Sequence, residues 1–114
     1  MVQIETRRED HTIWVLIKGE IDASSSIQLD ECLNLQLENK VPNISVDCTN
    51  LTYISSAGLG VFMSYIEDYK ENNQKFILFG LSEKVKNVFD MLGLDQLMNI
   101  VNTKHDAIYI LNEE

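Results

Sequence analysis

The sequence predicts an α/β fold in which helices pack against a mixed, mostly parallel β-sheet, with the element order ββαβαβαβα. Two observations support this prediction. Helical segments with an apolar face alternate with strand segments, and the strands are too short and too apolar to face solvent on either side. A chain of 114 residues has the usual length of one domain, so we expect a single domain over residues 1–114.

The chain opens with two predicted strands that pair with each other. Val2 and Ile4 belong to an alternating stretch, and residues 13–17 form a run of β-branched, aromatic and aliphatic side chains. A helix is expected next, because residues 22–26 supply several potential N-caps. Its apolar positions recur at helical spacing at Leu29, Cys32, Leu33 and Leu37.

Pro42 closes the first helical region, since proline cannot continue a helix. A short strand is predicted at residues 43–48, and residues 49–54 are expected to connect it to two adjacent serines. The second helix starts near Ser56. Its apolar set is Leu59, Phe62, Met63, Ile66 and Tyr69.

The second half of the chain predicts two more strands and two more helices. Residues 76–79 are four large apolar side chains in a row, as in a central strand covered on both faces. Ser82 is the candidate N-cap of the third helix, and Gly93 is its stop. The core positions of that helix are Val85, Val88, Phe89 and Leu92. A weak strand at 98–101 and a short helix at 103–111 complete the order.

The composition narrows the possible partners and the compartment. A net charge of −9 disfavours binding to nucleic acid and to membrane surfaces. It favours a partner protein that has a basic surface. The N-terminal residues contain no apolar leader, and no stretch approaches the ~18 apolar residues of a membrane span, so we expect a cytoplasmic protein. Cys32 and Cys48 lack metal-type spacing and are expected to be reduced core cysteines.

Several kinds of enzyme are disfavoured by the residues that their chemistry would need. His11 and His105 are the two histidines, and both are expected on the surface, so no base is in view beside a nucleophilic serine. The stretch "SSAGLG" is not a G-x-S-x-G elbow, and neither a dinucleotide fingerprint nor a P-loop occurs. We therefore predict no enzymatic activity, no catalytic residue and no metal site.

The strongest candidate site is the stretch "TYISSAGLGVF". In parallel sheets, sites gather where strands end and helices begin, and three polar loops are expected to meet there, at 20–26, 47–56 and 80–82. A serine in this position either caps the helix or is offered to another protein. Gly58 and Gly60 each cost ~0.5–1 kcal/mol in a helix relative to alanine, which favours close approach by a partner.

Three motifs together resemble the STAS domain of bacterial anti-sigma factor antagonists: "GEID", "VDCTNLTYISSAGLGVF" and "FGLSEKVKNVFDMLGL". The likeness covers nearly the whole chain, and it implies a STAS-like fold with helices packed against a mixed sheet. The family motif D-S-[ST]-G-L-G aligns its phosphorylated serine with Ser56. Ser55 stands where the family has aspartate, and Ala57 stands where it has a second hydroxyl.

The resemblance implies a role in transcription regulation by partner switching. The unmodified protein would bind an anti-sigma factor that is also a serine kinase, and phosphorylation of Ser56 would release it. A PP2C-type phosphatase would reset the switch. The chain would hold no cofactor, because ATP and Mg²⁺ belong to the partner kinase. The implied partner-binding residues are Asp22, Ser24, Asn50, Ile54, Ser55, Ala57, Gly58, Leu59 and Gly60. We expect a monomer.

Two other functions stay open. Because the aspartate of the family motif is replaced by Ser55, the chain could be a STAS domain that never receives phosphate. It would then be a constitutive interaction subunit of a signalling scaffold or a transport complex. A small hydrolase that uses Ser56 has less support, because no general base is in view.

Overall fold

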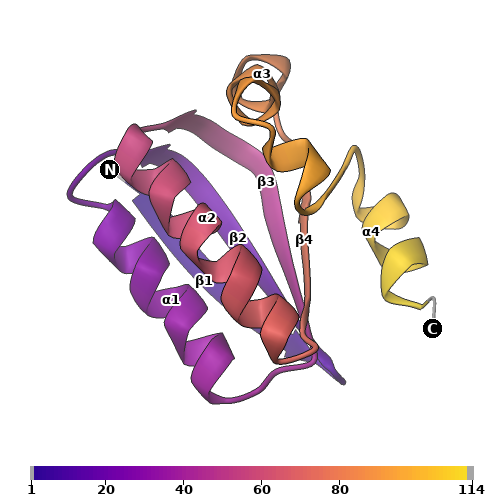
Figure 1. The fold of residues 1–114 in the computed structure, drawn as a ribbon. Coiled ribbons are helices and arrows are strands. Elements are labelled where there is room, and N and C mark those ends of the chain that lie inside the picture. Colours follow the sequence, from indigo (N-terminus) through magenta and orange to yellow (C-terminus); the bar gives the residue numbers. More distant parts are fainter. Residues whose placement is uncertain (1, 113–114) are drawn as a thin grey trace.

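A five-stranded sheet with the spatial order β1-β2-β3-β4-β5 forms the centre of the protein (Figure 1). The computed structural model describes residues 2–112. The strands are β1 (Val2–Glu9), β2 (Thr12–Ile21), β3 (Asn43–Ile54), β4 (Lys75–Phe79) and β5 (Asn99–Val101). β1 pairs antiparallel with β2, and every other neighbouring pair is parallel. The predicted mixed, mostly parallel sheet and the pairing of the first two strands are confirmed.

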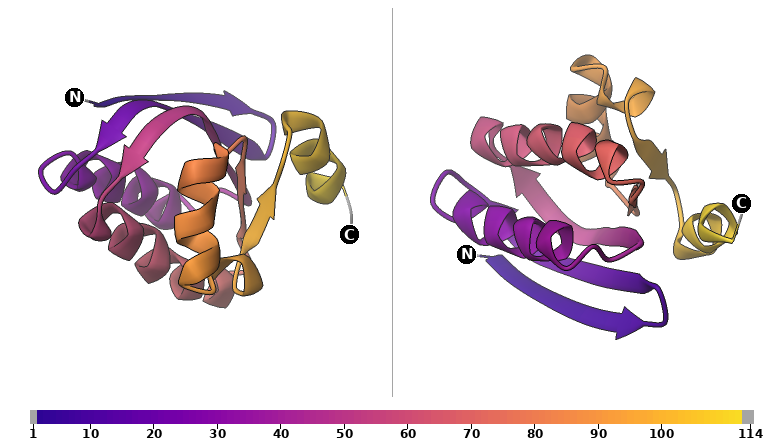
Figure 2. Two further views of the ribbon diagram at one scale, coloured as in Figure 1. Left: turned by 90° about the horizontal axis from the view of Figure 1, so that it is seen from above. Right: turned by 60° about the horizontal axis from the view of Figure 1, so that its bottom comes forward.

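Within the described residues, four α-helices cover the two faces of this sheet. They are α1 (Ser26–Glu38), α2 (Ser56–Glu71), α3 (Glu83–Met91) and α4 (Lys104–Leu111). α1 and α2 lie on one face with α3 beside α2, and α4 lies on the opposite face (Figure 2). A short 3₁₀ turn, η1 (Leu94–Gln96), which the sequence pattern did not predict, follows α3 and buries Leu94. The predicted order of strands and helices is otherwise confirmed.

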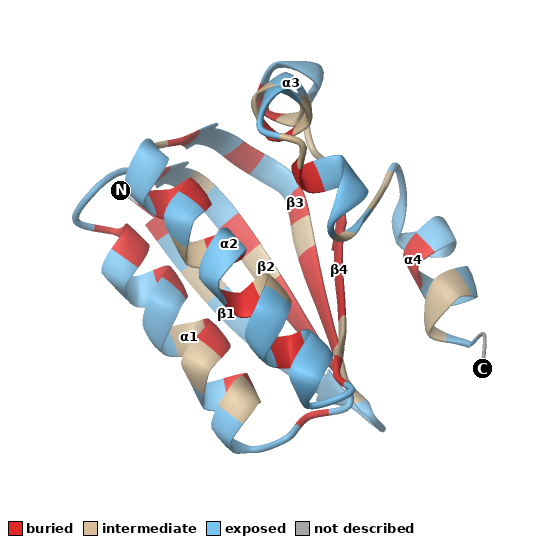
Figure 3. Ribbon diagram, viewed as in Figure 1, coloured by how far each residue is buried: buried red, intermediate tan, exposed pale blue. Residues whose placement is uncertain are grey.

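The main core lies between α1, α2, α3 and the sheet (Figure 3). Alternation along β2 directs Ile13, Val15 and Ile17 toward these helices, while Trp14 faces α4. The two long helices are also joined by hydrogen bonds from tyrosines of α2. The Tyr69 hydroxyl donates to the carbonyl of Leu33 over 2.6 Å, and burial raises the pKa of this hydroxyl. α1 and α2 are thus fixed side by side.

β3 is longer than predicted, and this changes the layout of the candidate site. Residues 49–54 were expected as a connection, but they continue the strand and pair with the end of β2 across two register shifts. Leu51 and Ile54 are buried on the core side, and the β-forming residues Thr52 and Tyr53 are exposed. Cys48 therefore lies inside β3 rather than at its end.

Two residues predicted to face the core are exposed instead. Met63 on α2 and Leu92, the C-cap of α3, are 48% and 52% exposed. Met63 follows Phe62, and one helical residue turns a side chain by about 100°, away from the buried stripe. Tyr65, which is outside the predicted apolar set of this helix, is buried instead. At Leu92 the helix ends, and the chain turns away before another element covers the side chain.

The predicted helix ends and cysteine states agree with the structure. The Ser82 hydroxyl accepts a hydrogen bond from the Val85 N–H over 3.3 Å, and Gly93 has the left-handed φ of 73° expected of a helix stop. Both cysteines are free thiols. Cys48 is buried as predicted and Cys32 is partly buried, and burial raises the pKa of both thiols.

Candidate functional site

The candidate site is built around the junction between β3 and α2. Ile54 ends β3 with a buried side chain, and Ser55 follows in an extended conformation with φ −84° and ψ 171°. The Ser55 hydroxyl accepts a hydrogen bond from the Gly58 N–H over 3.2 Å, and its own N–H donates to the Ile21 carbonyl over 2.8 Å. Ser55 is therefore the N-cap of α2, and it is tied to the end of β2.

Ser56 has a different environment although it is the next residue. It occupies the first position of α2 and is exposed. Within residues 2–112, the structure gives the Ser56 hydroxyl no hydrogen-bond partner. The two possibilities left open for the serine pair are thus divided between them: Ser55 caps the helix, and the Ser56 hydroxyl is presented to solvent.

This division predicts that alanine substitution changes the stability of the protein at one serine of the pair and leaves it nearly unchanged at the other. Ser55→Ala removes the cap, and we expect it to lower the free energy of unfolding by about 0.5–2 kcal/mol. Ser56→Ala removes an unbonded, exposed hydroxyl and should leave stability nearly unchanged. Urea denaturation, monitored by circular dichroism, measures the free energy of unfolding of both variants. Equal losses from the two variants would contradict the assignment of the cap.

A turn at residues 22–25, between β2 and α1, lies next to this helix end. The Asp22 Oδ1 atom accepts hydrogen bonds from the Ser25 N–H at 2.8 Å, the Ser25 hydroxyl at 2.9 Å and the Ser24 hydroxyl at 3.0 Å. These bonds, that from the Ser25 N–H foremost, lower the pKa of Asp22 to about 2. The carboxylate is exposed, and its negative charge is held beside the start of α2.

Gly58 and Gly60 have different roles in the first turns of α2. A Cβ atom at Gly58 would lie 2.7 Å from Ile21 Cγ2 and 2.8 Å from Ile54 Cγ1, so α2 packs directly against the ends of β2 and β3 there. A Cβ atom at Gly60 would meet no atom within 4 Å. Gly58 is needed inside the fold, whereas Gly60 leaves bare backbone on the surface.

The structure gathers most of the residues implied by the resemblance, but at different depths. Asp22, Ser24, Ser56, Ala57 and Gly60 are exposed around the start of α2, and Ser55 is partly buried. Ile54, Gly58 and Leu59 are buried, so their side of the helix holds α2 on the sheet.

Asn50 is separated from the rest of the set. It lines a hollow of about 210 Å³ with Gln3, Glu5 and Lys18, whose side chains alternate with those facing the main core. Its side chain therefore belongs to the sheet face opposite α1 and α2.

The third expected loop does not reach the site either. β4 pairs with β3 only as far as Asp47, and Gly80 then turns beside Thr49. β3 continues five residues beyond Thr49 to Ile54, about 16 Å at a strand rise of 3.2–3.4 Å per residue, so Gly80 lies well short of the junction between β3 and α2. The expectation that all three polar loops meet was wrong, because the strands differ in length.

The predicted surface positions of both histidines are confirmed, and they lie far from the serine pair. His11 precedes β2, whose opposite end contacts Ser55, and His105 is on α4 across the sheet. Among residues 2–112, no group of three or more His, Cys, Asp or Glu side chains is arranged to hold a metal ion. No helix in this described part is long and apolar enough to cross a membrane. The site as built presents a hydroxyl on a surface without an adjacent imidazole.

Fold and site together define a small α/β interaction domain that offers a serine at a helix N-terminus. The family model described as STAS domain matches residues 3–107. The anti-sigma-B factor antagonist of Listeria monocytogenes is 30% identical over 103 residues, which cover 90% of this chain and 90% of that protein. The chain belongs to the STAS-domain family of bacterial anti-sigma factor antagonists.

Solved structures show the same fold at lower identity. An anti-sigma factor antagonist from Mycobacterium paratuberculosis matches with a TM-score of 0.91 and 18% identity, covering 99% of this chain and 96% of that one. The phosphorylated form of the Bacillus cell fate determinant SpoIIAA matches with a TM-score of 0.74 and 20% identity, covering 98% and 100%. The relatives are regulatory proteins rather than enzymes, in agreement with the prediction from the sequence.

Proposed function

We propose that this protein antagonises an anti-sigma factor that is also a serine kinase, and that phosphorylation of Ser56 controls the complex. The observation that carries the proposal is the exposed, unbonded Ser56 hydroxyl at the first position of α2, beside a separate capping serine. The names of the relatives and the phosphorylated form of SpoIIAA support it. Unmodified protein binds the kinase and keeps it from its sigma factor, and phosphorylated protein is released.

The phosphoryl transfer uses groups from both proteins. The Ser56 oxygen attacks the γ-phosphorus of ATP, the bond from that phosphorus to the β–γ bridging oxygen breaks, and ADP leaves. The hydroxyl proton goes to a base of the kinase, which also supplies ATP and Mg²⁺. A PP2C-type phosphatase hydrolyses the phosphoserine to serine and inorganic phosphate. The proposal places these events in the cytoplasm, with the antagonist as a monomer.

The geometry of α2 explains why the lone domain tolerates the phosphate. The first N–H groups of a helix lack partners within the helix, and Ser55 takes that of Gly58. A phosphate on Ser56 brings about −1.5 to −2 charges to this positive end, a favourable contact of ~0.3–1 kcal/mol at an exposed site. The first turn of α2 itself contains no acidic residue, and the nearby Asp22 carboxylate is already held by the Ser24 and Ser25 hydroxyls and the Ser25 N–H.

The phosphoacceptor assignment is tested by phosphate incorporation. A serine-kinase anti-sigma factor from the same organism is purified and incubated with ATP, Mg²⁺ and the antagonist, and intact-mass spectrometry follows the product. We expect one phosphate on the natural chain and on Ser55→Ala, and none on Ser56→Ala, because Ser56 is the member of the serine pair whose hydroxyl is exposed and does not cap the helix. Phosphate on Ser56→Ala would show that another residue is the acceptor.

A second candidate function rests on the neutral cap. Ser55 stands in place of the aspartate of the family motif, so the carboxylate beside the acceptor is missing. The chain would then be a constitutive interaction subunit of a signalling scaffold or transport complex. Mass spectrometry of protein purified from its native host separates the two functions, because a Ser56 phosphate under any growth condition excludes the constitutive one.

A further inference from the structure

Four large apolar side chains are exposed on α2, at the end of α3 and just after η1, where these elements adjoin. Met63, Met91, Leu92 and Leu97 form this α2–α3 patch, and they are 48%, 84%, 52% and 63% exposed. Single exposed apolar residues are common, but several in one area mark an interaction surface. The two methionines add flexible, polarisable contact area of the kind found at protein interfaces.

Packing beneath the patch fixes its position on the molecule. The Phe62 ring on α2 lies 5.8 Å from the Phe89 ring on α3, so Met63, the residue after Phe62, and Leu92, one helical turn after Phe89, lie near the same helix junction. Leu97 lines a hollow of about 240 Å³ together with Ile66 and Lys70 of α2. α3 lies beside α2, with its axis crossing that of α2 at a steep angle (Figures 1 and 2).

The patch continues the surface that carries Ser56. Ser56, Gly60 and Met63 are spaced i, i+4 and i+7, so they lie on one stripe of α2. With a rise of 1.5 Å per residue, Met63 is about 10 Å from Ser56 along the helix axis. Gly60, between them, presents bare backbone with no atom near its missing Cβ. A partner that lies along this stripe reaches from the serine to the patch without a bulky obstacle.

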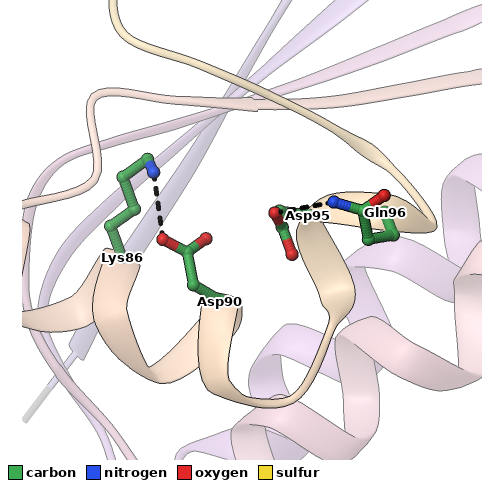
Figure 4. Close-up of polar contacts among 4 residues, drawn as sticks. All are labelled: Lys86, Asp90, Asp95 and Gln96. Atoms are coloured by element: carbon green, nitrogen blue, oxygen red, sulfur yellow. Dashed lines mark hydrogen bonds and ion pairs between the residues drawn. The ribbon is translucent and has the colours of Figure 1, made fainter.

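The charges around the patch indicate the chemistry of its occupant. Asp90 forms an ion pair with Lys86, whose Nζ lies 3.1 Å from Asp90 Oδ2, whereas Asp95 accepts a hydrogen bond from the neutral amide of Gln96 at 3.2 Å and has no cationic partner among residues 2–112 (Figure 4). Glu67 adds an exposed carboxylate one turn beyond Met63. A net charge of −9 opposes binding of a second copy of this chain to the patch, and it favours a partner with a basic surface.

We propose that the α2–α3 patch is a second docking element for the same kinase, which meets it with an apolar groove edged by Lys or Arg. The inference rests on the proposed function and extends its interface from the serine to α3 and η1. The apolar patch anchors the complex, and Ser56, at the other end of the stripe, carries the group that breaks it.

The chain offers a matched pair of leucines for the test. Leu92 and Leu35 are both 52% exposed, but Leu35 lies on α1, away from the patch. Binding of each Leu→Ser variant to the purified kinase is measured by calorimetry without ATP, so that no phosphate is transferred. We expect Leu92→Ser to weaken binding about tenfold or more, and Leu35→Ser to change it less than about twofold.

The other possible results of this experiment separate a failure of the patch proposal from a failure of the proposed function. Met91→Ser, at the most exposed of the four positions, repeats the test if Leu92→Ser does not fold, as judged by circular dichroism. Equal binding by the patch variants and the natural chain overturns the inference while leaving the proposed function intact. A natural chain that binds no kinase overturns the proposed function and this inference with it. A patch variant that instead abolishes self-association in sedimentation experiments shows that a second copy occupies the patch.

Discussion

Phosphorylation of Ser56 is expected to weaken binding to the kinase more than a hundredfold without unfolding the antagonist. The Ser56 hydroxyl is exposed at the start of α2, so a phosphate there projects into a docked interface. A charged group without a partner in such an interface must lose its hydration, which costs several kcal/mol. Even about 3 kcal/mol corresponds to more than a hundredfold in affinity. Calorimetry with phosphorylated and unphosphorylated protein measures the difference.

Two variants control for effects unrelated to charge. Ser56→Ala should bind the kinase as the natural chain does, because it removes only an exposed hydroxyl. Ser56→Asp should weaken binding in the same direction as phosphate but by less, since it carries one charge rather than about two. Thermal unfolding should change little in all three proteins. If the phosphorylated protein and Ser56→Asp both bind as tightly as the natural chain, charge at this position is not the switch.

The two glycines of α2 should respond to alanine in opposite directions. At Gly58 the added Cβ would lie 2.7 Å from Ile21 and 2.8 Å from Ile54, both buried, so α2 must move off the sheet. Such overpacking costs about 1–3 kcal/mol, and better helix propensity returns less than about 1 kcal/mol. Gly60→Ala meets no atom and should stabilise the fold by ~0.5–1 kcal/mol. Urea denaturation midpoints of both variants measure these effects.

The Gly60 variant also separates stability from function. If a partner lies against its bare backbone, Gly60→Ala should bind the kinase more weakly although the domain is more stable. If the Gly58→Ala variant unfolds at the same urea concentration as the natural chain, α2 does not pack closely against the ends of β2 and β3.

The local signals of the sequence determined most elements of the fold. Helix starts at Ser82 and Thr103, the stop at Gly93 and the apolar run at 76–79 depend on neighbouring residues in the chain, and the structure has them at those places. Caps and hydrophobic periodicity act within a few residues, so sequence alone is sufficient to find them. The motif around Ser56 likewise identified the family before any tertiary contact was known.

Tertiary structure decided which chemistry each residue of the site has available. Both serines of the pair are suitable caps, and the bond from the Ser55 N–H to Ile21 decides that Ser55 is the cap and Ser56 is free. The length of β3 depends on pairing with the distant β2, which separates residues 80–82 from the site. The contrasting surroundings of Gly58 and Gly60 depend on packing partners far away in the chain. Periodicity shows which residues of a helix are apolar, but only the assembled neighbours determine which of them are covered.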